Sequence, residues 1–121
     1  MSKNFENAVL LDFYGDMLTD KQRNFLDYYY NDDLSLSEIA ENEGISRQGV
    51  RDSIKKAEGI LTDMEQKLHF VAKSSENRGK LSEIIDLSDK ITDYNLHHSV
   101  SKELNDFAVN IKTLAMTLLE A

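Results

Sequence analysis

The segment GISRQGVRDSIKKAEG carries side chains whose types and spacing could bind nucleic acid. Arginine can form two hydrogen bonds with the edge of guanine, and glutamine can pair with adenine in the same way. Lysine and arginine also neutralise phosphates, the main source of affinity for duplex DNA, and a serine can bond a phosphate or cap a helix. The candidate DNA-binding residues are Ser46, Arg47, Gln48, Arg51, Lys55 and Lys56.

The distribution of charge favours this segment over the rest of the chain. The 121 residues carry a formal net charge of −8, which disfavours a protein that grips nucleic acid over its whole surface. Counted by region, the net charge is −7 for residues 1–43, +2 for residues 44–73 and −3 for residues 74–121. Most such runs of charge are simply solvated helix faces, so the DNA interpretation depends on the elements that position the run.

Those elements have the pattern of a helix-turn-helix. Ser35 and Glu38 have capping-box spacing, Gly44 can end the first helix, and Ser46 can cap the second. The turn also needs a small residue and apolar locking residues, and we expect these to be Ala40, Ile39, Ile45 and Val50. In such folds the amino end of the second helix enters the major groove.

The residues around this pattern resemble two known groups. LT..Q at Leu18–Gln22, SL.EIA at Ser35–Ala40 and GISRQ.V at Gly44–Val50 resemble the fourth region of bacterial sigma factors. The match is closer to the YlxM family of small helix-turn-helix proteins and covers roughly residues 5–68. The sigma resemblance places Arg47, Gln48, Gly49, Arg51 and Asp52 on the groove-facing and phosphate-facing side.

Two positions depart from the sigma pattern. Gly49 lacks a side chain where that pattern has a basic one, and Asp52 would repel phosphate, so no promoter preference is transferred. The YlxM resemblance implies a second function, because members are encoded beside the genes of the signal recognition particle. It implies a regulatory or accessory role in that protein-targeting pathway, with binding to the particle's GTPase or RNA. An acidic surface that includes Asp27, Asp32, Asp33 and Glu41 would suit a basic partner.

Helical periodicity extends through the rest of the chain. We expect helices at about residues 4–17 and from Asp20, the latter capped by Thr19, with one or two of Tyr28, Tyr29 and Tyr30 in the core. The apolar stripe that starts at Val50 continues to Val71, with a weak point at Gly59. We expect a connection at residues 74–79, helices at 81–94 and 104–119, and a break at NLHHSVS between them.

These patterns predict an all-α protein with a helix-turn-helix and extra C-terminal helices. The resemblance implies that the head belongs to the sigma factor region four-like, winged-helix-like class without a clear wing. We expect a helix-turn-helix head at residues 1–60 and a helical extension at 61–121 that packs on the head or forms a homodimer. The leading function is a DNA-binding regulatory protein, with double-stranded DNA as partner. The targeting-pathway role is the alternative.

Composition disfavours several other classes of protein. The chain has no cysteine, no run of roughly 18 apolar residues and no secretory signal, which favours the cytoplasm without membrane insertion. His69, His97 and His98 lack the spacing of a zinc site, and no motif of a nucleophile or phosphate loop is present. We therefore expect no enzyme activity, no metal and no cofactor.

Overall fold

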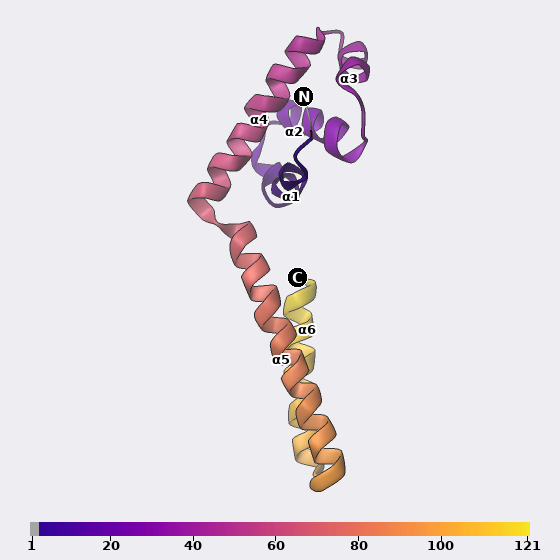
Figure 1. The fold of residues 1–121 in the computed structure, drawn as a ribbon, viewed down its shortest axis with the longest axis vertical. Helices are drawn as coiled ribbons and strands as arrows, with labels where there is room; N and C mark the ends of the chain where they lie inside the picture. Colours follow the sequence, from indigo (N-terminus) through magenta and orange to yellow (C-terminus); the bar gives the residue numbers. More distant parts are fainter. Residues whose placement is uncertain (1–2) are drawn as a thin grey trace. The chain divides into compact units, whose positions relative to one another are not determined.

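The computed structural model describes residues 3–121, and all regular structure in that range is helical (Figure 1). The chain divides into two compact units, the first ending at Val71 and the second comprising Ala72–Ala121. The helices are α1 (Phe5–Tyr14), α2 (Asp20–Leu26), α3 (Leu36–Glu43), α4 (Arg47–Leu68), α5 (Phe70–His98) and α6 (Lys102–Glu120). A 3-10 turn, Gly15–Met17, follows α1, and a π-helical turn, Asp27–Asn31, follows α2. The all-helical class predicted from the sequence is confirmed.

Short polar side chains fix where the helices begin. The hydroxyl of Ser35 accepts a bond from the Glu38 amide at 3.1 Å, and the Glu38 carboxylate accepts one from the Ser35 amide at 3.2 Å. This is the predicted capping box, which satisfies two amides that a helix start would otherwise leave open. Thr19 and Gln22 form the same reciprocal pair at the start of α2.

The first unit has one apolar core between α1, α2, α3 and α4. Tyr29 is buried, and Tyr28 and Tyr30 are partly buried against the same core, so all three tyrosines contribute where one or two were expected. The hydroxyl of the buried Tyr14 donates to Glu65 across the core at 2.5 Å. The residues buried most completely in this core are Tyr14, Leu26, Ile39, Val50, Ile54, Ala57 and Leu61.

Two expectations about the connections are wrong. Residues 74–79 are helical within α5, and the break lies at His69, whose φ is 57°. The predicted stripe from Val50 to Val71 therefore belongs to two helices, while Gly59 lies inside an unbroken α4. The break predicted at NLHHSVS is shorter in the structure, because α5 continues to His98 and only residues 99–101 connect it to α6.

Distant contacts explain why α5 starts at Phe70. The amide of Phe70 donates to the Tyr14 hydroxyl at 3.1 Å, and the amide of Val71 donates to the Glu65 carboxylate at 3.0 Å. The Tyr14 ring also stacks on the Phe70 ring with centroids 6.0 Å apart. Side chains of α1 and α4 thus satisfy first-turn amides of α5, which makes a new helix start favourable there.

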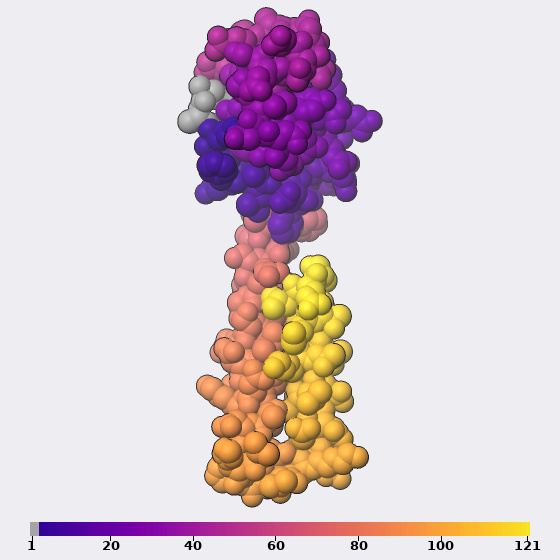
Figure 2. Space-filling model, turned by 90° about the vertical axis from the view of Figure 1, so that its right-hand side faces the viewer, coloured from indigo at the N-terminus to yellow at the C-terminus, as the bar shows by residue number. Residues whose placement is uncertain are grey.

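The second unit is an antiparallel hairpin of α5 and α6 (Figure 2). Lys112 pairs with Asp89 at 2.9 Å, and Arg78 donates to the Leu119 carbonyl at 2.9 Å. At the turn, the Asn95 amide group donates to the Ser101 carbonyl at 2.7 Å. None of the helices in the described chain has the length and hydropathy that crossing a bilayer requires.

Candidate nucleic-acid interface

The turn between α3 and α4 has the geometry that the glycine predicted. Gly44 adopts the left-handed conformation with φ 68°, which an L side chain rarely occupies, and its amide bonds back to the Ala40 carbonyl. The Ile45 amide donates to the same carbonyl at 3.1 Å. Helix α3 therefore ends within one residue of Gly44, and α4 begins three residues later.

Apolar packing determines which side of α4 faces outward. Val50, Ile54 and Ala57 are fully buried and lie three or four residues apart, so they form one inward stripe. Ile39 and Ala40 of α3 are buried as predicted, whereas Ile45 is 40% exposed and does not lock the turn into the core. Val50, in the first turns of α4, fills the core next to α3, so burial of Ile45 is not required.

Ser46 is the N-cap of α4, one of the two roles predicted for it. Its hydroxyl accepts a bond from the Gly49 amide at 3.0 Å. A β-carbon built at Gly49 would lie 3.2 Å from that hydroxyl oxygen, which is a tight contact. The glycine at position 49 therefore lets the Ser46 hydroxyl cap the helix without a steric conflict, and it presents no side chain at the amino end of α4.

The cations of early α4 are free of ion pairs. Within residues 3–121, Arg23, Lys67 and Lys112 each pair with a carboxylate, at 2.9 Å in each case. The four basic candidates form no such pair in this range. Arg51 is partly buried, and Arg47, Lys55 and Lys56 are exposed. Their positive charge remains available to an anionic partner.

Gln48 has a neighbour that limits its predicted role. Its side-chain amide donates to the Asp52 carboxylate at 2.8 Å, a bond between positions one turn apart on α4. One amide proton is therefore engaged, while both side chains stay exposed. Asp52 places a negative charge beside the candidate basic residues, so it would repel a phosphate bound there while it orients Gln48.

A basic residue outside α4 adjoins this surface. Lys21 of α2 and Lys56 of α4 line one open depression of about 220 Å³, together with Thr19, Gln22, Phe25 and Ser53. Lys21 forms no ion pair within the described chain. Sequence reasoning did not select Lys21, because it lies 35 positions before Lys56 and only folding brings them to one depression. Its exposed positive charge is the sole local signal that could have identified it.

A polar contact joins α1 to the middle of α4. The buried Asn7 donates its side-chain amide to the Glu58 carboxylate at 2.7 Å and lies 3.4 Å from the Tyr30 hydroxyl. Burial raises the pKa of Glu58, although the Tyr30 hydrogen bond and the Lys55 charge oppose that shift. The contact joins α1 to α4 just after Lys55 and Lys56.

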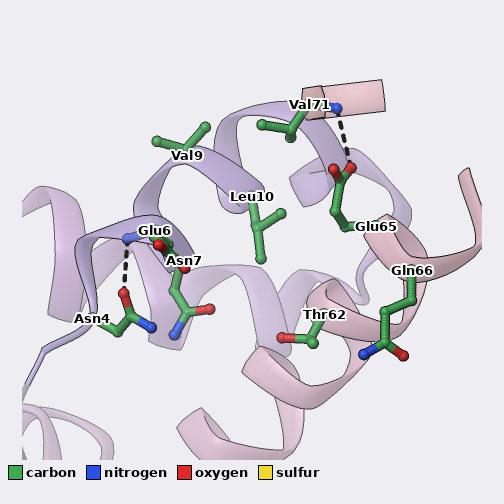
Figure 3. Close-up of a pocket in the computed structure, with 9 residues that line it drawn as sticks. All are labelled: Asn4, Glu6, Asn7, Val9, Leu10, Thr62, Glu65, Gln66 and Val71. Carbon is green, nitrogen blue, oxygen red and sulfur yellow. Dashed lines mark hydrogen bonds between the residues drawn. The ribbon is translucent and has the colours of Figure 1, made fainter. Parts of the chain in front are cut away.

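Further along α4, a cavity of about 530 Å³ opens between α1 and α4 (Figure 3). Val9 and Leu10 of α1 line one side of it, and Thr62, Glu65 and Gln66 of α4 line another. The Glu65 carboxylate is bonded to the Val71 amide at the cavity edge. No lysine or arginine among residues 3–121 lines this cavity, so the candidate nucleic-acid interface is the surface of early α4 and not the cavity. The described residues also contain no group of three metal-binding side chains.

A buried stripe, a left-handed glycine turn and a capped, outward-facing second helix together define a helix-turn-helix protein. A family model described as "UPF0122: Putative helix-turn-helix protein, YlxM / p13 like" matches residues 1–107, and the chain belongs to this family. The YlxM resemblance is thereby confirmed.

Relatives in several bacteria carry the same family name. A UPF0122 protein of Desulforamulus reducens is 48% identical over 88 residues, which are 72% of this chain and 75% of the relative. One from Acetivibrio thermocellus is 49% identical over 85 residues, covering 70% and 73% of the two chains. A third, from Shouchella clausii, is 45% identical over 84 residues, covering 69% and 77%.

Proposed function

We propose that this protein is a non-enzymatic regulator in the cytoplasm that binds double-stranded DNA with the amino-terminal half of α4. The observation that carries the proposal is the set of unpaired cations on this helix, which follows a helix-turn-helix turn. In a chain of net charge −8, this is where a polyanion would meet the least repulsion.

The side chains divide into two roles. Arg47 and Gln48 lie in the first turn of α4 and would approach base edges, with Asp52 orienting the Gln48 amide. Arg51, Lys55 and Lys56 would contact phosphates and set the register of the helix on the duplex. Lys21 would extend the phosphate contacts from α2, because it shares a depression with Lys56.

The experiment that tests the proposal compares two double variants of the full chain. Arg47→Ala with Arg51→Ala should lower affinity for a random duplex at least tenfold at low salt, since two phosphate or base contacts are lost. Lys67→Ala with Lys73→Ala removes the same charge elsewhere and should change affinity less than threefold. Equal losses in the two double variants would show that net charge, rather than the α4 interface, determines binding.

A second candidate function is the accessory role in the signal recognition particle pathway. The observation that favours it is the acidic surface of the first unit, where Asp32 and Glu41 are exposed and form no ion pair within residues 3–121. Asp33 and Asp27 are engaged with Lys3 and Arg23, so Asp32 and Glu41 are the better contacts for a basic partner.

Neutralising that surface separates the two functions. Asp32→Asn with Glu41→Gln should weaken binding to the particle's GTPase at least tenfold if the acidic surface is the contact. The same double variant should bind duplex DNA as well as wild type or slightly better. Binding of the particle's RNA would instead require the α4 cations and would be lost in the Arg47→Ala, Arg51→Ala variant.

A further inference from the structure

The second unit exposes a row of large apolar side chains on α5. Ile84, Leu87, Ile91 and Tyr94 are spaced three, four and three residues apart, so they share one side of the helix. Their exposed fractions run from 41% to 63%. A solvated helix does not normally carry such a row, because removing large apolar side chains from water is favourable.

Helix α6 carries a matching row: Leu104, Phe107, Ile111, Leu114 and Leu118. Its side chains are 42% to 67% exposed. Leu104 lines the same open groove, of about 500 Å³, as Leu87, Ile91 and Tyr94. The two rows therefore lie on one side of the hairpin and form one apolar face, which we call the hairpin face.

The seam between α5 and α6 explains why this face is left exposed. The side chains buried there are small or polar: Ser88, Asn95, Ala108 and Ala115. Such residues let two helices approach closely but bury little apolar surface. Most of the large apolar residues lie outside the seam, so the hairpin has no substantial core until something covers its face.

We propose that the hairpin face binds the same face of a second copy of this chain, forming an antiparallel four-helix bundle. The spacing is self-complementary, as a two-fold interface requires. The α5 row is symmetric about position 89, so a reversed copy sets Ile84 against Tyr94 and Leu87 against Ile91. The α6 row is centred on Ile111, with Leu104 and Leu118 seven residues to either side.

The two centres lie at one level of the hairpin. Lys112, the neighbour of Ile111, pairs with Asp89 at 2.9 Å. A single two-fold axis perpendicular to the helices can therefore run through the centres of both rows. This axis places α6 against α6 of the second copy and α5 against its α5. The hairpin face has nine large side chains, each with an exposed area on the order of 100 Å². Together they supply roughly the 800 Å² of accessible surface that each partner buries in a standard interface.

A parallel arrangement of the two hairpins is the alternative. It would set α5 of one copy against α6 of the other at the same level, with Ile84 near Leu118 of the other copy. The antiparallel arrangement instead sets Leu118 against Leu104 and Ile111 against itself, so contacts at these positions distinguish the two arrangements.

The mass of the full chain in solution is the first test, and it does not rest on DNA binding. Light scattering at micromolar concentration should give twice the 13.8 kDa of one chain. Ile111→Asp should halve that mass, because two carboxylates would be buried at the axis. Thr113→Asp, on the other side of α6, should leave it unchanged, with helix content by circular dichroism checked for both. A monomeric wild type, or a dimeric Ile111→Asp variant, would overturn the proposal.

Engineered cysteines test the antiparallel arrangement without disrupting the face. The chain has no cysteine of its own, so every cross-link reports the introduced pair. Ile111→Cys should form a disulfide dimer by itself, because it would meet its own copy at the axis, whereas Thr113→Cys should not. A mixture of Leu104→Cys and Leu118→Cys chains should cross-link far more than either alone. A dimer in which Ile111→Cys and this mixture both fail to cross-link would overturn the arrangement.

Discussion

Gln48 and Asp52 are joined by a 2.8 Å hydrogen bond on the exposed side of α4. In the proposed complex, the bond would hold the Gln48 amide toward a base edge, while the Asp52 carboxylate would repel a nearby phosphate. Asp52→Asn keeps an oxygen that can accept from Gln48 but removes the charge. We expect this variant to bind duplex DNA roughly fivefold more tightly, the effect of about 1 kcal/mol of like-charge repulsion across a short distance in water.

The control for this prediction is Asp63→Asn, which removes a charge that Lys67 already neutralises. It should leave duplex affinity within twofold of wild type. Fluorescence anisotropy with a labelled duplex measures both variants. Unchanged or weaker binding by Asp52→Asn would show that Asp52 is not adjacent to phosphate in the complex.

The raised pKa of Glu58 predicts a pH dependence of stability. Burial lifts the pKa of this carboxyl above its ordinary value of 4.5, so the folded state holds the proton more tightly than the unfolded chain does. Its contribution to stability is fully present below pH 4.5 and is lost as the pH rises through the folded pKa. Glu58→Gln, which can still accept from Asn7, should gain stability over wild type as the pH goes from 4 to 7. Urea unfolding at both pH values measures this, and a difference independent of pH would contradict it.

The Tyr14 hydroxyl predicts a local effect at the start of α5. Tyr14→Phe removes both the donor to Glu65 and the acceptor of the Phe70 amide, so we expect a loss of about 1–3 kcal/mol in the free energy of unfolding. Hydrogen exchange at the Phe70 amide should accelerate. Tyr94→Phe, at an exposed ring of α5, is the matched control and should have little effect on either measurement. An unaltered Phe70 exchange rate in Tyr14→Phe would refute the capping role.

Alanine substitutions at two glycines should change the free energy of unfolding in opposite directions. Gly59 lies inside α4, and a β-carbon there would meet nothing within 4 Å, so Gly59→Ala should stabilise the protein by about 1 kcal/mol. Gly44 has an equally open site but a φ of 68°, so Gly44→Ala should destabilise it by about 1 kcal/mol. Thermal unfolding measures both, and changes of the same sign would mean that the turn geometry is different.

Local signals explain why much of the head could be predicted from the sequence. The Ser35–Glu38 pair, the glycine at 44 and the Ser46 cap each act within four residues, so their spacing is enough to place α3 and the start of α4. The family resemblance rests on these same positions. Candidate contacts on α4 could be proposed because helical periodicity assigns the outward side once Val50 is recognised as buried.

Contacts between distant residues explain what could not be predicted. Helix α5 begins at Phe70 because Tyr14, 56 positions earlier, accepts its amide, and no pattern near His69 carries that information. Residues 74–79 contain serine, asparagine and glycine, yet Glu76 pairs with Lys80 and Arg78 reaches the Leu119 carbonyl, so the helix continues. Lys21 could not be predicted for the same reason, since only folding places it in the depression that Lys56 also lines.

The salt dependence of duplex affinity tests the proposed DNA-binding function most directly. If Arg51, Lys55 and Lys56 of α4 and Lys21 of α2 make about four phosphate contacts, log affinity of the full chain for a random duplex should fall with log salt concentration at a slope near −3.6 for each bound head. Arg51→Ala should reduce that slope by about 0.9, because one contact is lost. Duplex affinity that cannot be measured even at low salt, or a slope that Arg51→Ala leaves unchanged, would contradict the account.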